Sequence, residues 1–199
     1  MRLILASASE GRKELLSYLK IPFEIIPSSI DEDKVIGKTP LETIKLRAKL
    51  KGEEVASSKK HKSAIILSAD SGAILNGELI GRPKNYDDAV RILSTLSGRT
   101  HRFITAVYLS QLSDLKVYED YETSFVTFRK LSKDDIRRYL SITSYTRYAG
   151  GYAIASAQDF ITKIDGSVSN VIGLPLEKVI LILCRFGWRN LNSQRGTFP

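Results

Sequence analysis

The sequence has little cysteine and no long apolar run, and each scarcity excludes a class of protein. Its 199 residues include one cysteine, Cys184, so no internal disulfide can form and a reducing, intracellular setting is expected. Cys184 falls in the apolar run 179–186, which predicts a buried packing role. No apolar run approaches the roughly 20 residues of a membrane span. The short apolar start at 2–6 passes straight into polar residues, unlike a secretion signal. We therefore expect a cytoplasmic protein that does not associate with membranes.

The chain is otherwise of ordinary globular composition, with a basic balance. Hydrophobic residues make up 43% of it, enough for a sizeable core, and neither repeats nor low-complexity tracts interrupt it. The net charge of +8 attracts polyanions, so nucleic acids and nucleotides are both candidate partners. The basic residues are scattered, and aromatic and basic residues are not interleaved as in nucleic-acid-binding modules. No stable nucleic-acid complex is therefore expected.

Strand and helix patterns mix along the chain. Strands are predicted at 2–6, 23–26, 63–69, 100–110, 116–128 and 160–164, with a hairpin at 73–80 around Asn76-Gly77. Helices are predicted from about 12, from a capped start at 39 to 57, and at 87–96, 132–140 and 175–186. This order indicates an α/β fold, with a mixed sheet flanked by helices, in one domain or one domain of two lobes. The stretch 189–199 is polar and is expected to be a mobile tail.

A loop of small polar residues, Ser7 to Gly11, joins the first strand to the first helix. Backbone N–H groups at such a helix start form an anion site, and Arg12 and Lys13 add cationic donors. Serines before a helix are also ordinary N-caps, so the loop alone leaves both interpretations open.

Two acidic features could carry metal or catalytic chemistry. The run Asp31-Glu32-Asp33 lies in a polar loop, where clustered carboxylates can hold Mg²⁺ or Mn²⁺ or simply form a surface turn. Asp70 directly follows the buried strand 63–69, at the edge where α/β proteins place ligands. It could bind a metal, activate a water or cap the next turn.

Two basic features follow the hairpin. Gly81-Arg82-Pro83-Lys84 could bring backbone and cations close to a phosphate, or form an ordinary turn. The patch 97–102 (SGRTHR) is compatible with a helix cap as well as with a functional role.

Taken together and in order, the motifs of residues 2–186 resemble the Maf family of nucleotide pyrophosphatases. The matching segments are LASASEGRKELL (5–16), IPFE (21–24), IDE (30–32), AKLK (48–51), ADS (69–71), GRP (81–83), LSGRTH (96–101), TAV (105–107), ET (122–123), VTFR (126–129), AGGY (149–152) and VIGLPL (171–176). Each motif is modest, but their order along nearly the whole chain is specific.

The resemblance implies a single domain over 1–188, built as two lobes around a central cleft and similar to the inosine triphosphate pyrophosphatases. Members of the family hydrolyse a nucleoside triphosphate to the monophosphate and pyrophosphate with a divalent metal, so Mg²⁺ or Mn²⁺ is the implied cofactor. House-cleaning of non-canonical or modified nucleotides is the implied role, and a homodimer is the implied assembly.

The resemblance also assigns roles to individual residues. Asp70 and Glu32 match the catalytic carboxylates and would also hold the metal. The implied substrate-binding residues are Ser7, Ser9, Arg12, Lys13, Lys51 and Arg82. The positions that help to choose the base are Gly11, Ser71 and Ala155.

Several departures from the family pattern bear on the substrate. Glu10-Gly11 replaces a Pro-Arg pair, Arg147-Tyr148 replaces Asp-Lys, and Ala155 replaces a glutamine. The family's usual rule for thymidine or uridine substrates therefore cannot be applied, and small residues at 11 and 155 suit a larger or modified base. We hypothesise that Arg147 partly replaces the missing lysine. The alternative is a catalytically weak, nucleotide-binding regulator of cell division. Retention of Glu32, Lys51 and Asp70 favours an enzyme.

Overall fold

The computed structural model describes residues 2–188, which form a mixed seven-stranded sheet with helices packed around it. The strands are β1 (Leu3–Leu5), β2 (Glu24–Ile25), β3 (Ile65–Leu75), β4 (Glu78–Ile80), β5 (Thr100–Gln111), β6 (Lys116–Phe128) and β7 (Ile161–Asp165). The α-helices are α1 (Glu10–Ser17), α2 (Pro40–Ala56), α3 (Tyr86–Leu96), α4 (Lys133–Ile142), α5 (Val168–Ile172) and α6 (Leu176–Arg185). Short 3₁₀ turns η1 (Glu32–Lys34), η2 (Lys59–His61), η3 (Leu112–Asp114), η4 (Tyr145–Arg147) and η5 (Ala149–Gly151) occupy the loops. The mixed α/β architecture predicted from the sequence is confirmed.

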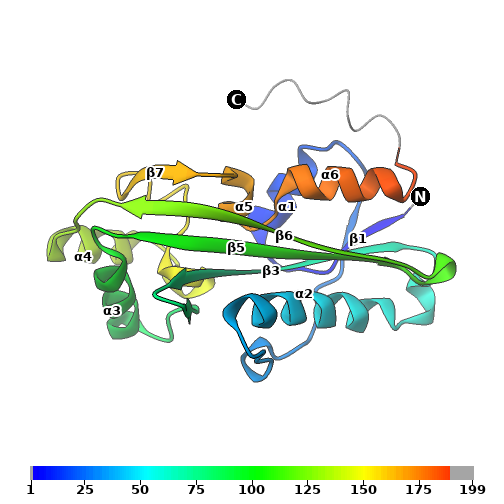
Figure 1. Cartoon of the computed structure of the whole chain (residues 1–199), viewed down its shortest axis with the longest axis horizontal. Coiled ribbons are helices and arrows are strands. Elements are labelled where there is room, and N and C mark those ends of the chain that lie inside the picture. The colour runs from blue at the N-terminus through cyan, green and yellow to red at the C-terminus, as the bar shows by residue number, and fades with distance from the viewer. Residues whose placement is uncertain (1, 189–199) are drawn as a thin grey trace.

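The sheet is parallel at one side and antiparallel at the other. Its strand order is β2-β1-β3-β5-β6-β7, with β4 also paired to β3. β1 runs parallel to both β2 and β3, whereas β3, β5, β6 and β7 pair antiparallel in succession. The long strands β3, β5 and β6 extend well beyond the end of β1 (Figure 1). One sheet therefore runs through both ends of the molecule.

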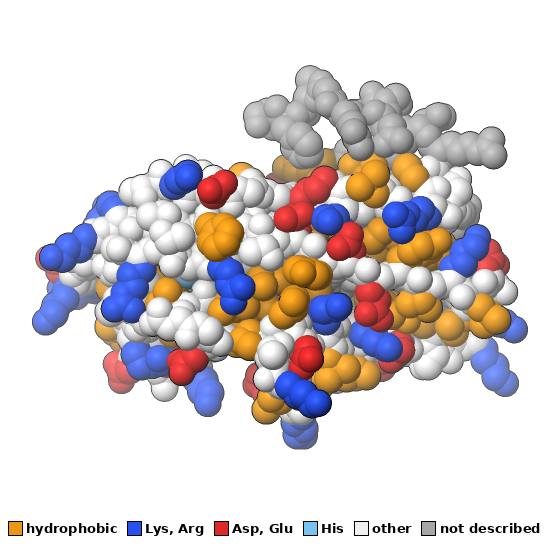
Figure 2. Space-filling model, viewed as in Figure 1, with side chains coloured by type: hydrophobic (Ala, Val, Ile, Leu, Met, Phe, Trp, Pro, Cys, Tyr) orange, Lys and Arg blue, Asp and Glu red, His pale blue; other side chains and the backbone are white. Residues whose placement is uncertain are grey.

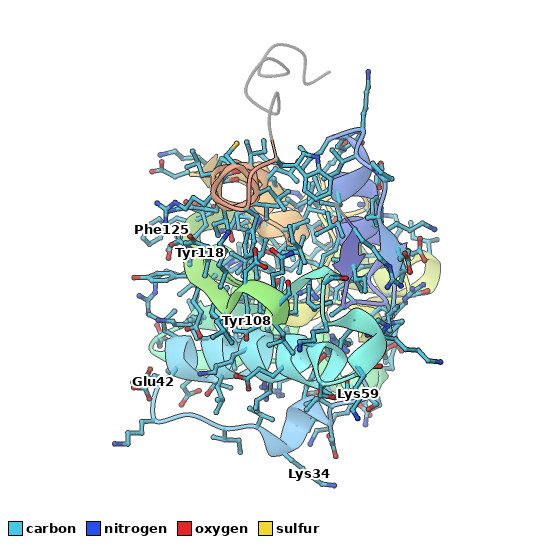
Figure 3. The ribbon with its side chains drawn as sticks, turned by 90° about the vertical axis from the view of Figure 1, so that its right-hand side faces the viewer. Lys34, Glu42, Lys59, Tyr108, Tyr118 and Phe125 are labelled. Atoms are coloured by element: carbon cyan, nitrogen blue, oxygen red, sulfur yellow. The ribbon has the colours of Figure 1, made fainter. Side chains whose placement is uncertain are left out.

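Helices cover both faces of the sheet (Figure 1). α2 lies along one face, α1, α5 and α6 lie against the other, and α3 and α4 pack at the far end of the long strands. The largest two apolar clusters lie under α1 and α6 and around α3 and α4. Figure 3 shows Tyr108 of β5 at the interface with α2, where a side chain at Gly52 would collide with its ring. These two clusters form the largest parts of the core.

Local signals explain the element boundaries. Thr39 caps α2 by accepting a hydrogen bond from the Glu42 N–H, and Pro40 takes the first helical position. Asn76 and Gly77, with φ of 53° and 85°, form the two-residue turn between β3 and β4.

Side chains of both charges are interspersed on the face in Figure 2, so that face carries no single-sign patch.

The structure differs from the sequence-based expectation at four places. α1 begins at Glu10 rather than Arg12, because Ser9 is its N-cap. β3 continues through Asp70 to Leu75, so Asp70 lies within the strand. α5 was not expected, and Cys184 is half-buried rather than buried. The polar stretch 189–199 lies outside the described residues. Among residues 2–188, no helix is long and apolar enough to cross a membrane.

Candidate functional site

The site is centred on a gap beside β3. β1 pairs with β3 up to Leu67, and β4 pairs with it only from Ala73 onward. Residues 68–72 therefore have a strand partner on the β5 side alone. Asp70 lies in the middle of this gap, and two cavities of about 650 and 960 Å³ meet there. The carboxyl end of β1 opens onto the same gap, which is where open α/β sheets place their ligands.

On the α2 face of β3, three charged side chains form a chain of contacts with Lys51 at its centre. The Lys51 Nζ lies 2.6 Å from Asp70 Oδ1 and 2.8 Å from Glu32 Oε1. Lys51 and Asp70 are 4% and 3% exposed. Arg82, an exposed residue, reaches the other oxygen of Glu32 at 3.3 Å. The structure thus brings together four of the residues predicted from the sequence.

Glu32 is held ionised by its neighbours. Burial opposes ionisation of this carboxyl, but Lys51, Arg82 and Arg12 outweigh the burial and lower its pKa. Glu32 therefore keeps a negative charge near neutral pH, as an oxygen ligand for a cation requires.

On the opposite face of β3, Arg12 is buried among neutral acceptors. Its Nε donates to Gly173 O at 2.8 Å, and its two terminal nitrogens donate to Ser7 Oγ at 3.1 Å and Ser71 Oγ at 3.0 Å. Burial lowers the pKa of Arg12, and the negative charges of Asp70 and Glu32 oppose that shift. The guanidinium thus joins α1, β3 and the end of α5.

Sequence reasoning missed the residues that support Ser71. Thr105 Oγ1 lies 2.9 Å from Ser71 Oγ and donates to Asn170 O at 2.8 Å. Asn170, fully buried, donates its amide protons to Phe103 O and Ser124 Oγ. Asn170 lies just before the motif at 171–176, but nothing in the local spacing indicates its contacts with residues 46 to 67 positions earlier in the sequence.

The two cavities differ in their lining but share the charged centre. Both are lined by Glu32, Asp70, Ser71, Arg82 and Ala149. The smaller cavity reaches the start of α1, α5 and the segment 146–155, and it includes Ser7, Ser9, Gly11, Arg12, Lys51, Arg147 and Ala155. All three residues expected to choose the base therefore line this cavity.

The start of α1 fits the anion site considered from the sequence. Ser9 caps the helix through the Arg12 N–H, and Ser7 Oγ accepts from the Ser9 N–H. Within residues 2–188, the N–H groups of Glu10 and Gly11 have no hydrogen-bond acceptor. Lys13 does not line the cavity. It pairs with Glu10 at 3.6 Å on the surface.

The carboxylates fit a divalent cation that is shared with a phosphorylated ligand. Asp70 Oδ2 is buried, and no hydrogen-bond partner for it lies in the described part of the chain. No group of three or more His, Cys, Asp or Glu residues forms a complete metal cage within residues 2–188. Mg²⁺ is commonly held by one or two carboxylates plus substrate phosphates. Asp70 and Glu32 match that arrangement.

An α/β cleft that places two carboxylates beside several cations has the charge pattern that suits a highly charged phosphorylated ligand. The chain belongs to the Maf family, since residues 2–186 match the family described as "Maf-like protein". Two similar proteins are named dTTP/UTP pyrophosphatase. The one from Aquifex aeolicus is 38% identical over 199 residues, covering all of both chains. The one from Syntrophomonas wolfei is 36% identical over 191 residues, covering 96% of this chain and 100% of that protein.

A solved structure shares the fold. The HAM1 protein from Coxiella burnetii matches 93% of this chain and 99% of its own, with a TM-score of 0.56 and 16% identity. At that identity the likeness concerns the fold alone, and it agrees with the mixed α/β architecture expected from the sequence.

Proposed function

We propose that the protein hydrolyses a nucleoside triphosphate between its α- and β-phosphates, releasing the monophosphate and pyrophosphate, and that dTTP and UTP are its preferred substrates. The observation that carries the proposal is the buried Lys51–Asp70 pair in the β3 gap, with one Asp70 oxygen left without a partner among residues 2–188. Membership of the Maf family, and the names of the two relatives, support the same reaction.

The cations of the site suit a triphosphate. Lys51 and Arg82 lie on either side of Glu32, and the buried Arg12 lies across β3 from them. Preorganised positive groups in a partly dry cleft stabilise charge that develops on phosphate oxygens. The N–H groups of Glu10 and Gly11, which have no acceptor within residues 2–188, add a further anion site at the start of α1.

Asp70 is the residue proposed to act on water. Lys51 occupies Oδ1, which leaves Oδ2 as the acceptor for a proton. The water oxygen forms a bond to the α-phosphorus, and the bond from that phosphorus to the oxygen bridging to the β-phosphate breaks. The water proton passes to Asp70, and pyrophosphate leaves with the bridging oxygen. Positioning of the water, together with neutralisation of the leaving group, lowers the barrier.

Asp70 and Glu32 would hold the divalent metal, Mg²⁺ or Mn²⁺. When bound, such an ion supplies positive charge to the phosphate oxygens and orients the triphosphate. The contribution of the chain is to hold both carboxylates against Lys51 and to keep Glu32 ionised between Lys51 and Arg82.

The preferred base is proposed from the relatives and from the room in the smaller cavity. A side chain at Gly11 would lie 3.1 Å from Ile172 Cγ2, so glycine there opens no free space for a bulkier base. This argues for a pyrimidine of ordinary size over the larger or modified base that Gly11 suggested.

The test is a panel of canonical and modified nucleoside triphosphates, incubated with the purified protein and Mg²⁺ or Mn²⁺. Monophosphate, pyrophosphate and inorganic phosphate are quantified separately. Metal-dependent release of pyrophosphate, highest for dTTP and UTP, is expected. Nucleotide binding without turnover would instead favour the regulatory alternative.

A further inference from the structure

A histidine and a tyrosine that lie far apart in the sequence form a buried hydrogen-bonded pair beside the smaller cavity. His101 of β5 is 1% exposed and Tyr152 is 3% exposed. His101 Nε2 lies 2.8 Å from Tyr152 Oη, and within the described residues His101 Nδ1 has no partner. The reaction proposed above does not use either group. A polar pair is costly to bury unless its geometry is held.

Tyr152 belongs to the wall of the cavity, whereas His101 does not. The cavity is lined by Tyr152 and its neighbours in the segment 146–155, and Phe103 lies beside them. The Tyr152 ring packs edge-on against Phe128, with ring centroids 4.9 Å apart. His101 therefore stands behind the wall and touches it through the phenol oxygen.

The segment that carries Tyr152 depends on contacts from other elements. Gly150 donates its N–H to Gly81 O at 3.0 Å, and Ala153 donates its N–H to Tyr139 Oη at 3.0 Å. Gly150 has a φ of 73°, and a side chain there would lie 3.1 Å from the Tyr152 ring. The ring thus packs directly on the backbone of its own segment. A hydrogen bond that fixes the Tyr152 phenol oxygen therefore also fixes the position of the segment 146–155.

We propose that His101 is a positioning residue for the nucleotide, acting through Tyr152 to fix the 146–155 wall of the binding cavity. The inference rests on the proposed function, because the wall matters only if the cavity holds nucleotide. Burial lowers the pKa of His101 to about 4, so a neutral imidazole makes the contact near neutral pH.

A purely structural role and a positioning role differ in the kinetics that they predict. Asp70 and Lys51 belong to β3 and α2, and neither is hydrogen-bonded to the pair. A looser wall weakens binding of nucleotide in the ground state and in the transition state alike. The expected effect is therefore a higher KM with kcat retained.

The experiment compares Tyr152→Phe, His101→Leu and the double variant, with KM and kcat measured for dTTP. Each single change should raise KM about fivefold to tenfold, with kcat within about threefold of the wild type. The double variant should be no worse than either single change, because both remove the same contact. His101→Gln keeps a donor toward the phenol oxygen and should recover most of the affinity.

Tyr108→Phe is the matched control. Tyr108 is also buried in the sheet, and it packs against α2 (Figure 3). It does not line either cavity. Its KM should equal that of the wild type. An increase as large as that of Tyr152→Phe would overturn the proposal, because it would show that loss of any buried phenol loosens the site.

A spectroscopic measurement separates this inference from the proposed reaction. The chain has two histidines, His61 and His101, so its imidazole nitrogen spectrum is simple to assign. Tyr152→Phe should shift the His101 signals and leave those of His61 in place. If the signals shift and KM for dTTP stays within twofold, the positioning role is overturned. If the wild type turns over no triphosphate while the signals still shift, the proposed function has failed and the positioning role with it, although the pair itself exists.

Discussion

The Lys51 Nζ lies 2.6 Å from Asp70 Oδ1, and both side chains are at least 95% buried. Lys51 comes from α2, and Asp70 comes from the stretch of β3 that is paired with β5 on one side only, so the ion pair joins the helix to the sheet beside the gap. Removing one member of such a pair leaves an uncompensated charge in a poorly hydrated place. The pair therefore contributes to folding as well as to the proposed chemistry.

We predict that Lys51→Met lowers the free energy of unfolding by about 3–5 kcal/mol, because it leaves Asp70 buried without its partner. Denaturant unfolding measures the change. Lys49→Met, two residues earlier on α2, is the control. Lys49 is 44% exposed and its contacts with Glu53 and Glu119 are 3.9 Å long, so its loss should cost at most about 1 kcal/mol. Equal costs for the two variants would contradict the importance of the buried pair.

Arg12→Lys should raise KM for the triphosphate about tenfold or more. A lysine cannot reach the three acceptors that the guanidinium contacts on α1, β3 and the end of α5. Steady-state kinetics with dTTP checks this. Lys13→Ala tests the neighbouring candidate. Because Lys13 is half exposed and does not line the cavity, a rise of less than about twofold is expected. Reversed magnitudes would show that the wrong cation has been assigned to the phosphates.

Arg147→Ala should raise KM about tenfold with little change in stability. Arg147 is exposed, lines the smaller cavity and forms no ion pair with any of residues 2–188. Its charge is thus available to a phosphate of the substrate. The family pattern has a lysine at the neighbouring position 148. A KM equal to that of the wild type, from the same kinetic assay, would remove Arg147 from the substrate-binding residues.

The buried imidazole of His101 gives the folded protein a dependence on pH. Burial lowers the pKa of His101 to about 4 in the folded state, against about 6.5 in an unfolded chain. Between these values the unfolded state binds more protons, so stability is lost as the pH falls. The slope approaches about 1.4 kcal/mol per pH unit. Denaturant unfolding at pH 7 and pH 5 should show a smaller loss for His101→Gln than for the wild type. Identical losses would mean that the imidazole is not held neutral.

Local features of the fold could be predicted because their causes are local. The cap at Thr39, the turn at Asn76-Gly77 and the capping box at Ser132 each act over a few residues. The extent of β3 could not be found this way. A polar Asp70 after an apolar run indicates a strand end, but pairing with β5 and neutralisation by Lys51 carry the strand on to Leu75.

The sequence predicted the charged residues at the centre of the candidate site, but not the contacts that hold the site together. Asp70, Glu32, Lys51 and Arg82 were singled out through motifs, and the fold brings them within contact of one another. The hydrogen bond from Arg12 to Gly173 O joins residues that are 161 positions apart in the sequence. The hydrogen bond between His101 and Tyr152 joins β5 to the segment 146–155. Such contacts depend on how the sheet folds, which no spacing in the sequence records.

The most direct test of the central claim is hydrolysis of dTTP in ¹⁸O-labelled water, with Asp70→Asn run alongside. Attack on the α-phosphorus places the label in the monophosphate and leaves pyrophosphate unlabelled. Asp70→Asn should lower kcat at least a hundredfold, because it removes the proposed proton acceptor. Label in pyrophosphate or in inorganic phosphate, or undiminished turnover by Asp70→Asn, would contradict the proposed reaction.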